Sequence, residues 1–483
     1  MIADLAAAPD VSLPDASVCV IGSGPAGAVV SVELARMGVE VLLLEAGGHD
    51  QESENLRYNS ACQLGGSSNL WAGRCAPLEP IDFVSRPWVR DSGWPLTRKD
   101  LDPYYERASA LLDLPQDVPV PRSTLGDIVD IKLFLWAGKP FNAGRHLREA
   151  VRQYDNLNIF LHAPVGRIRG DCVEVMGPGG GTRRARANII VLAAGGIETP
   201  RLLLSSGIGN DNTGRYFSTH PKADMAVLVL SSRRPTSSPL FTDTSVAGGR
   251  VRHGIGFTAD AQERFGLLNH YVQATPLPES SRSRVFATLR GSSPLDSAFV
   301  DRSRLLRGLL PGLGMMAAEA IERLERRPPT ARTFILRAFL DQYPDPANRV
   351  TLDTKRDEHG LPLARVTWRY GERDRRSVLD FFTRLDAAFR SARLGHVEFS
   401  RLGHPGDWPL TAIHSHFMGA TRMGNDLHTA VTDEHGEVHG RPNLFIAGPS
   451  LFPSYGYANP FYTIVALSLR LADHLKARLD ARS

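Results

Sequence analysis

The hydrophobic pattern at the start of the chain predicts a strand, a turn, a helix and a second strand. A β-branched apolar run covers residues 18–21, which is too short for a helix and typical of a buried parallel strand. A glycine-rich turn at 22–27 leads into a helical segment at 28–37, and a second apolar run follows at 39–44. This order is characteristic of a parallel βαβ unit.

Later segments predict that the same domain is resumed further along the chain. The apolar run at 189–194 ends in two glycines and precedes a helical segment, which repeats the order strand, turn, helix. A buried strand is expected again at 443–447. A final helix is expected to start at Asn459 and Pro460, with the asparagine as N-cap, and to continue to residue 479. We therefore expect one α/β domain assembled from discontinuous segments.

The intervening residues, from about 220 to 415, have a different pattern. Short apolar or alternating segments at 226–230, 348–352 and 363–368 predict an antiparallel sheet. Leucines and methionines at helical spacing predict an Arg-rich helical stretch over residues 305–339. This spacing favours a packed core helix over a membrane-facing one. We expect this region to form a second unit inserted into the first.

Composition narrows the class of protein. The 483 residues carry a formal net charge of only +4, so electrostatics indicates no nucleic-acid partner. The four cysteines lack metal-site or CxxC spacing, so no metal is expected. The N-terminal residues do not resemble a secretory signal, and no run approaches the ~20 apolar residues of a spanning helix. We expect a cytoplasmic protein without a transmembrane segment.

The turn after the first strand has the residues of a dinucleotide site. Gly22 permits the tight turn, Gly24 allows backbone to approach a pyrophosphate, and Gly27 allows the helix to pack on the strand. The helix N-terminus offers free N–H groups to the phosphates. Glu45 follows the second strand, where an acidic side chain binds the adenosine ribose. An ordinary βαβ unit is the alternative, and the unit alone does not separate NAD from FAD.

Three separated blocks resemble the glucose–methanol–choline (GMC) oxidoreductases, a family of FAD enzymes. The blocks are the N-terminal turn ending in LEAG, the segment LGGSSNLWAGRC with GWPL and LDPYYERA, and the segment from HFMGATRMG to GYANPFYTIVAL. They cover nearly the whole chain in the family's order. The second block is most similar to the pyranose-oxidase-like and bacterial sugar or polyol dehydrogenase branches.

The resemblance implies FAD rather than NAD, and an architecture of two parts. A Rossmann-type FAD-binding domain is expected from residues 1–80, 160–220 and 425–483. A substrate-binding domain and cap elements, with a mainly antiparallel sheet flanked by helices, are expected from residues 81–159 and 221–424. The residues expected to bind the cofactor are Gly22, Gly24, Pro25, Ala26, Gly27, Glu45, Ala46, Gly66, Ser67, Asn69, Leu70, Trp71, Val165, Ala194, Gly195, Gly448, Pro449, Pro460 and Phe461.

The candidate catalytic residues lie in the last block. Alcohol oxidation by a flavin requires loss of the hydroxyl proton and hydride transfer to flavin N5. By resemblance, His416 is the catalytic base, a role that an unperturbed histidine pKa of about 6.5 suits. His414 is its nearest rival, and a hydrogen-bonded core histidine is the structural alternative. Asn459 stands at the partner position, where an amide binds the substrate oxygen. A simple N-cap is its alternative role.

Two departures from relatives bear on the substrate and the cofactor. Tyr457 replaces a histidine of some sugar-dehydrogenase relatives, which indicates a changed substrate pocket or only a changed wall. No histidine lies between His49 and His146, where some relatives attach FAD covalently, so non-covalent FAD is expected. His220 and His439 lie in family-like segments and are interpreted as structural. The helix after Pro460 is expected to direct its positive end at the flavin.

These observations predict an FAD-dependent alcohol oxidase or dehydrogenase that acts on a sugar, aminosugar, cyclitol or polyol. One alternative is a flavoprotein of the same superfamily with a non-oxidative reaction. Another is a flavin electron-transfer subunit of a dehydrogenase complex. The electron acceptor, whether O₂, a quinone or a redox protein, is left open, as are the exact substrate and the oligomeric state.

Overall fold

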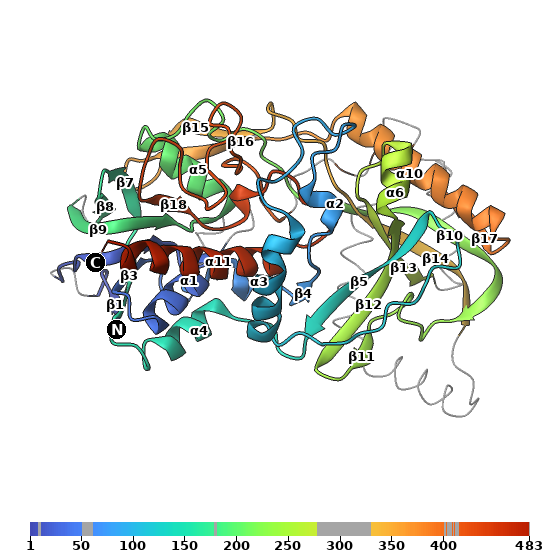
Figure 1. Cartoon of the computed structure of the whole chain (residues 1–483), viewed down its shortest axis with the longest axis horizontal. Helices are drawn as coiled ribbons and strands as arrows, with labels where there is room; N and C mark the ends of the chain where they lie inside the picture. Colours follow the sequence, from blue (N-terminus) through green and yellow to red (C-terminus); the bar gives the residue numbers. More distant parts are fainter. Residues whose placement is uncertain are drawn as a thin grey trace.

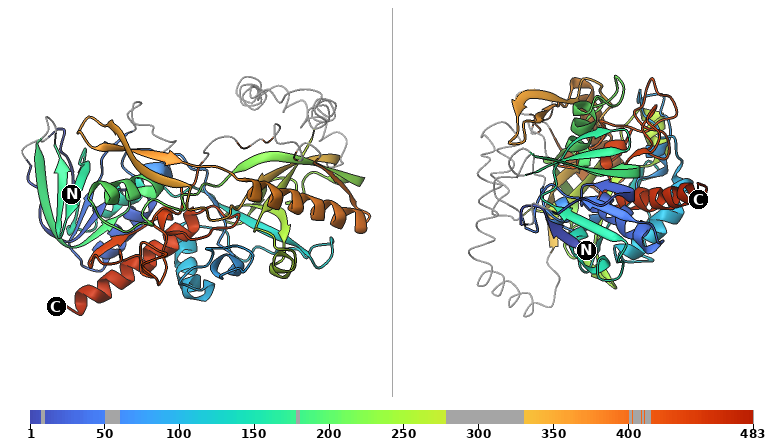
Figure 2. Two further views of the ribbon diagram at one scale, coloured as in Figure 1. Left: turned by 90° about the horizontal axis from the view of Figure 1, so that it is seen from above. Right: turned by 90° about the vertical axis from the view of Figure 1, so that its left-hand side faces the viewer.

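The structure is a computed structural model that describes residues 1–7, 11–50, 61–177, 181–277, 330–399, 402, 408, 410 and 415–482. Two large β-sheets lie at opposite ends of its long axis (Figure 1). The view from above in Figure 2 shows the same separation. Both chain termini lie at the end that holds the first sheet (Figure 1).

The first sheet contains strands from the beginning, the middle and the end of the chain. Its order is β1-β6-β3-β2-β9-β8-β7, and β18 pairs with β9. All pairs are parallel except β7 with β8 and β8 with β9. The expected return of the chain at 189–194 and 443–447 is confirmed. The strands are β1 (Ile2–Asp4), β2 (Ala16–Ile21), β3 (Val41–Leu44), β6 (Leu157–Leu161), β7 (Val165–Arg169), β8 (Cys172–Met176), β9 (Thr182–Leu192) and β18 (Leu444–Ile446).

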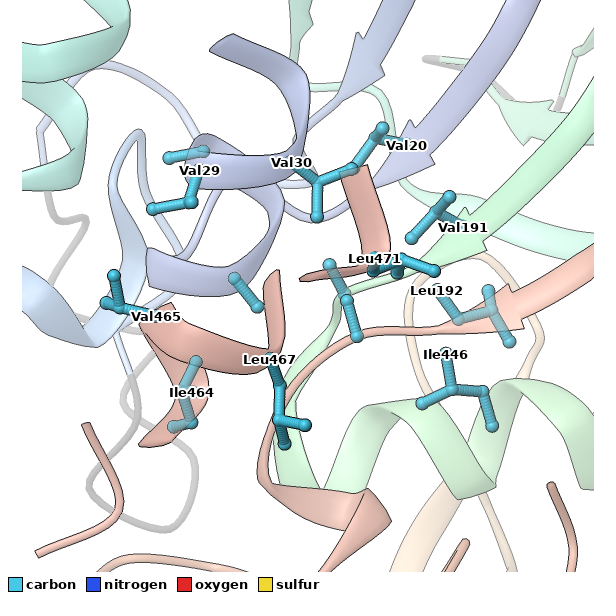
Figure 3. Packing of buried hydrophobic residues seen from close by; sticks show 14 of the residues in the cluster. Val20, Val29, Val30, Val191, Leu192, Ile446, Ile464, Val465, Leu467 and Leu471 are labelled. Carbon is cyan, nitrogen blue, oxygen red and sulfur yellow. The ribbon is translucent and has the colours of Figure 1, made fainter. Parts of the chain in front are cut away.

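Helices from distant parts of the chain share one core with this sheet. The C-terminal helix α11 packs against α1 and α3. Figure 3 shows Val20 of β2, Val30 of α1, Val191 of β9, Ile446 of β18 and Leu471 of α11 in one buried cluster. Removing this apolar surface from water joins the three segments into one folding unit. The helices are α1 (Pro25–Arg36), α3 (Arg98–Leu111), α4 (Ala143–Ala150), α5 (Gly195–Ser205) and α11 (Phe461–Asp480).

The second sheet is antiparallel. Its order is β17-β10-β14-β13-β12-β5-β4, and β11 pairs with β12. One of its faces packs on α10 (Glu372–Ser391) and α6 (Ala259–Phe265) through buried apolar side chains such as Ile255, Leu336 and Phe381. The strands are β4 (Arg74–Cys75), β5 (Val129–Ala137), β10 (Lys222–Pro235), β11 (Thr244–Val246), β12 (Gly249–Phe257), β13 (Tyr271–Pro276), β14 (Thr330–Phe339) and β17 (Gly395–Glu398).

One expectation for the inserted region is wrong. The last part of the predicted helical stretch, Thr330–Phe339, is strand β14 between β10 and β13. Its alternate residues Phe334, Leu336 and Ala338 are buried in the core of this sheet, so a period of two decides the structure. The preceding residues, 305–329, lie outside the described residues.

Another pair of expected strands forms, but in a separate place. The segments predicted at 348–352 and 363–368 are β15 (Arg349–Arg356) and β16 (Pro362–Thr367). They build their own two-stranded sheet and do not join the large antiparallel sheet.

The described residues also form shorter elements. They are α2 (Pro80–Phe83) and the 3₁₀ turns η2 (Gly66–Asn69) and η7 (Pro449–Leu451). Strand β6 (Leu157–Leu161) belongs to the first sheet although it begins before the expected boundary at residue 160. Strand β4 (Arg74–Cys75) belongs to the second sheet although it lies before the expected boundary at residue 80. The exact domain boundaries stay a prediction. Within the described ranges, none of the helices combines the length and the apolar character needed to cross a membrane.

Candidate active site

The turn between β2 and α1 has the packing that a phosphate-binding loop requires. Gly22 has a φ of +101°, and a Cβ there would lie 2.7 Å from the Ala193 carbonyl oxygen. A Cβ on Gly27 would lie 1.9 Å from the Gly22 oxygen, whereas a Cβ on Gly24 would meet none of the described residues within 4 Å. Pro25 is the first residue of α1. The turn is therefore closed on the protein side and open where a pyrophosphate would approach.

Glu45 lies behind this turn and holds it in place. Its Oε2 accepts hydrogen bonds from Ser23 N at 2.9 Å and Ser23 Oγ at 2.5 Å, and Oε1 accepts one from Gly47 N at 2.9 Å. Burial raises the pKa of Glu45, and these hydrogen bonds act in the opposite direction. The next residue, Ala46, is exposed. The contact of Glu45 with a ribose stays a prediction.

Three strands of the first sheet end side by side next to this turn. Ile21 of β2 is paired with Leu192 of β9, and Leu192 is paired with Ile446 of β18. Ligands of parallel α/β sheets bind at such carboxyl ends. The predicted positions Gly22, Ala194, Gly195, Gly448 and Pro449 all follow directly on these three strands, and Val165 is the first residue of β7.

The loop after β3 lies against the glycine-rich turn. A Cβ on Gly66 would come within 3.0 Å of the Gly24 Cα. The Asn69 side chain donates to the Gly66 oxygen at 2.9 Å and accepts from Asn142 Nδ2 at 2.7 Å, so the amide shapes the loop. The Ser67 hydroxyl accepts a hydrogen bond from Ala61 N at 3.3 Å, and the Leu70 side chain is exposed.

Trp71 connects this loop to the C-terminal helix. Its ring stacks on the ring of Phe461, with centroids 3.6 Å apart and planes 8° apart. Its indole N–H donates to the Phe141 oxygen at 2.7 Å. The predicted positions Trp71, Pro460 and Phe461 therefore lie together at the start of α11.

The loop that carries His416 is held from two sides. On one side, His220 N donates to the Ser415 oxygen at 3.1 Å. On the other, Gly419 N donates to the Pro449 oxygen at 3.3 Å. His416 itself has a φ of +64°, a left-handed backbone that few residues other than glycine adopt. Such strain is typical of functional positions that the surroundings fix. His414, its rival, lies outside the described residues.

His416 is surrounded by cations and by a second histidine. Burial, together with the charges of Lys222 and Arg74, lowers the pKa of His416 to about 3. Its Nδ1 lies 3.3 Å from Nδ1 of His220, whose pKa is lowered well below its usual value by burial. Both imidazoles are neutral at neutral pH, which is the form in which His416 can accept a proton.

Asn459 lies beside Arg74. Its Nδ2 donates to the Arg74 carbonyl oxygen at 3.2 Å, while its Oδ1 is buried without a partner among the described residues. The expected capping role is wrong, because α11 begins at Phe461, with Pro460 as N-cap, and no side chain caps it. The amide therefore keeps a free acceptor for a ligand.

Two other residues singled out in the sequence have protein partners. The Tyr457 ring packs on Phe134 and Tyr271 at centroid distances of 5.7 and 5.2 Å, and its hydroxyl lies 3.3 Å from Glu79 Oε1. Tyr457 thus belongs to an aromatic wall. His439 Nε2 contacts the Gly424 oxygen at 3.0 Å.

Sequence reasoning missed residues that border His416. Arg74 and Lys222 act on His416 through their charges, and His220, interpreted as structural, contacts it directly. Arg74 stands in the quoted GMC-like block, but no spacing rule separates it from the other arginines. Their position beside His416 arises only in the folded chain, because β4 and β10 belong to the same antiparallel sheet with four strands between them.

Comparison with protein-family models agrees with this arrangement. A model described as FAD binding domain matches residues 15–57. Two models described as GMC oxidoreductase match residues 141–222 and 344–468. The FAD prediction is confirmed.

Known proteins are similar to the chain over nearly its full length. It is 24% identical to 2-methyl-1,2-propanediol dehydrogenase of Mycolicibacterium austroafricanum over 97% of this chain and 96% of that protein. It is 26% identical to 6'''-hydroxyparomomycin C oxidase of Streptomyces lividus over 95% and 92%. The crystal structure of pyridoxine 4-oxidase from Mesorbium loti is similar in fold, with a TM-score of 0.55, 18% identity and coverage of 95% and 99%. The chain therefore belongs to the GMC oxidoreductase family, and it is an FAD-dependent oxidoreductase that acts on CH–OH groups.

Proposed function

We propose that this enzyme oxidises a primary or secondary alcohol of a sugar- or polyol-like molecule to the carbonyl, with His416 as the base. The observation that carries the proposal is the position of His416, whose imidazole is neutral and whose backbone is strained, near Arg74. The carbonyl oxygen of Arg74 accepts a hydrogen bond from Asn459, whose Oδ1 has no partner among the described residues. A base and an orienting amide are the two protein groups that alcohol oxidation needs.

The residues at the edge of the first sheet fit FAD. The open approach at Gly24 and the free N–H groups of α1 suit the pyrophosphate, and the start of α11 suits a flavin that becomes negative on reduction. Bound FAD supplies the two-electron acceptor for the reaction. We propose that it is bound without a covalent link, since no histidine lies in the loop at 61–75.

The chain's own residues divide the remaining tasks. His416 accepts the substrate hydroxyl proton on a ring nitrogen, and Asn459 orients the substrate oxygen. His220 contacts Nδ1 of His416 and positions its ring.

The names of the relatives support an alcohol as substrate. One is a diol dehydrogenase and another an oxidase, both at low identity. A flavoprotein with a non-oxidative reaction, or an electron-transfer subunit, would not need both His416 and Asn459. The electron acceptor is not part of the proposal.

The test is anaerobic bleaching of the purified yellow protein by a panel of sugars, polyols and simple alcohols. Loss of the oxidised flavin absorbance with at least one alcohol is expected, followed by recovery when O₂ or a quinone is added. No bleaching across the panel would contradict the proposal. Acid precipitation of the same protein should release all flavin into the supernatant, and a yellow pellet would refute non-covalent binding.

A further inference from the structure

Buried polar atoms without hydrogen-bond partners gather around Arg74. Among the described residues, these atoms are Nε2 of His220, Oδ1 of Asn459, Nε and Nη2 of Arg74 and the Tyr271 hydroxyl. The Tyr271 hydroxyl neighbours the Arg74 guanidinium and interacts with it, but the two groups do not form a hydrogen bond of good geometry. A buried polar group left unpaired costs about 1–3 kcal/mol, and more if it is charged. Four such side chains in one place indicate that a ligand completes their hydrogen bonds.

Arg74 is held so that one edge of its guanidinium is free. Its Cζ lies 3.8 Å from the Phe134 ring centroid and 4.3 Å from the Phe339 centroid, which fixes the plane of the group. The two unpartnered atoms, Nε and Nη2, form the same edge of that plane. This edge donates two parallel hydrogen bonds and matches the two oxygens of a carboxylate.

Lys222 adds a second cation on the same sheet face. It stands directly opposite Phe339 in the ladder of β10 and β14, so their Cβ atoms are about 5 Å apart. In the part of the chain that the structure describes, its ammonium contacts no carboxylate. Burial, followed by the charges of Arg74 and Arg337, lowers the pKa of Lys222. Arg74 and Lys222 therefore flank Phe339 on one sheet face, and Asp243 only partly offsets the charge of Arg74.

The other cations of this face are already paired. Arg337 donates to both Asp224 oxygens at 2.8 and 3.0 Å. Lys132 contacts Glu79 at 2.7 Å. Arg252 lies 3.6 Å from Asp243. Arg250 also lies near Asp243, so among the described residues Arg74 and Lys222 are the cations of this face without a carboxylate within 4 Å.

We propose that the alcohol substrate carries a carboxylate, as in a hydroxy acid or a sugar acid, and that this carboxylate binds the free edge of Arg74 with Lys222 as a second contact. The inference rests on the proposed function and narrows its substrate class. A bound carboxylate would also offset the two charges that weaken His416 as a base. The same charges disfavour an aminosugar cation.

The first experiment compares acids with matched neutral alcohols on the FAD-loaded enzyme. Anaerobic flavin bleaching is measured with D-gluconate against D-glucitol and with glycolate against ethylene glycol. We expect at least one acid to have a KM at least tenfold below that of its neutral partner. Acetate, which has no hydroxyl, should compete with that acid and perturb the oxidised flavin spectrum. A neutral partner with the lower KM in both pairs, or no competition by acetate, overturns the inference.

Variants locate the carboxylate contact. Arg74→Gln should raise the ratio of the acid's KM to the neutral alcohol's KM at least tenfold, because a hydrogen bond to a charged group contributes about 1.5–3 kcal/mol. Lys222→Gln should raise the same ratio, and it serves as the second variant if Arg74→Gln fails to fold. Arg250→Gln removes a half-exposed cation beside Asp243 on the same sheet face and is the matched control. An equal effect of Arg250→Gln, or no change of the ratio in Arg74→Gln and Lys222→Gln, contradicts the inference.

The outcomes separate this inference from the proposed function. If no alcohol bleaches the flavin but acetate perturbs its spectrum in the wild type and not in Arg74→Gln, the carboxylate site stands and alcohol oxidation fails. If neutral polyols bleach the flavin and acetate has no effect, oxidation stands and the carboxylate site fails.

Discussion

His416 has a left-handed backbone, a lowered pKa and two neighbouring cations, and each feature depends on contacts with other segments. In the proposed function, the His416 imidazole accepts the substrate proton. His416→Ala should therefore leave FAD bound but slow anaerobic flavin reduction by about 100-fold or more. The measurement is stopped-flow reduction of the FAD-loaded variant by the best substrate from the panel.

A second histidine provides the control for this substitution. His396 on β17 contacts Glu398 at 3.3 Å, away from the residues that border His416. His396→Ala should reduce the flavin within about threefold of the wild-type rate. Equal rates for His416→Ala and the wild type would remove His416 from the mechanism.

Tyr457 replaces a histidine of some sugar-dehydrogenase relatives, and a substitution tests whether its hydroxyl takes part in the reaction. Its hydroxyl is directed at Glu79 and its ring packs in the aromatic wall, so we expect it to support the site without taking part in chemistry. Tyr457→Phe should lose about 1 kcal/mol of unfolding free energy from the lost hydrogen bond. Its flavin reduction rate should stay within about threefold of wild type, and a loss of 30-fold or more would assign the hydroxyl a role in the reaction.

Individual residues differ in how far sequence could identify them. His416 and Asn459 stand in the block that resembles the GMC family, and Arg74 lies near both of them. The sequence could not single out Arg74 and Lys222 as ligand-binding cations, because that proposed role depends on their lacking a carboxylate partner. Pairing depends on which carboxylates the second sheet brings near, and that is a tertiary property.

At the scale of elements, two glycines of the β2–α1 turn have different expected roles: Gly24 contacts the ligand, and Gly27 allows close packing. Gly24→Ala adds a methyl group in open space, so the unfolding free energy of the FAD-free protein should change by less than about 0.5 kcal/mol. The methyl group would occupy the approach of the pyrophosphate, and FAD affinity should fall at least tenfold. The measurements are denaturant unfolding without FAD and fluorescence titration with FAD.

Gly27→Ala is the matched variant three residues later. Its methyl group would lie 1.9 Å from the Gly22 oxygen, so the FAD-free protein itself should lose about 1–3 kcal/mol. If both variants lower stability equally, or if Gly24→Ala binds FAD normally, the division of roles between these glycines is incorrect.

Elements with a clear local sequence pattern could be predicted, whereas elements whose secondary structure depends on neighbouring strands could not. The strands that return to the first sheet have apolar runs that tertiary contacts only reinforce. Thr330–Phe339 contains residues compatible with either period. Its place between β10 and β13 selects the strand, so sequence periodicity alone gave the wrong answer.

At the scale of the molecule, a buried polar network joins α2 to the second sheet. Asn269 Nδ2 donates to Asp82 Oδ1 at 3.0 Å, and Arg86 pairs with Asp341 at 3.5 Å. Asp341 N donates to Nδ1 of His270 at 3.1 Å. Burial raises the pKa of Asp82 to about 7 and lowers the pKa of His270 to about 3. The two shifts have opposite consequences for stability at acidic pH.

The signs follow from proton binding in the folded and unfolded states. Between pH 4 and 7, folded Asp82 keeps a proton that the unfolded chain has released, so its contribution to stability falls as pH rises. Between pH 6.5 and 3, the unfolded chain binds a proton at His270 that the folded chain does not, so this contribution falls as pH falls. In the wild type these two effects partly cancel between pH 4 and 6.5.

Substitution of one partner at a time should expose each effect. Relative to wild type, Asp82→Asn should gain unfolding free energy as pH rises from 4 to 7, by up to about 1.4 kcal/mol per pH unit. His270→Asn keeps an acceptor for Asp341 N and should gain relative to wild type as pH falls from 6.5 to 4. Denaturant unfolding of the three proteins at half-unit pH steps gives both difference curves. Because each variant is compared with its own value at the far end of the range, a constant loss of packing does not affect the result. Slopes of the same sign, or two flat curves, would show that these groups do not titrate as their burial requires.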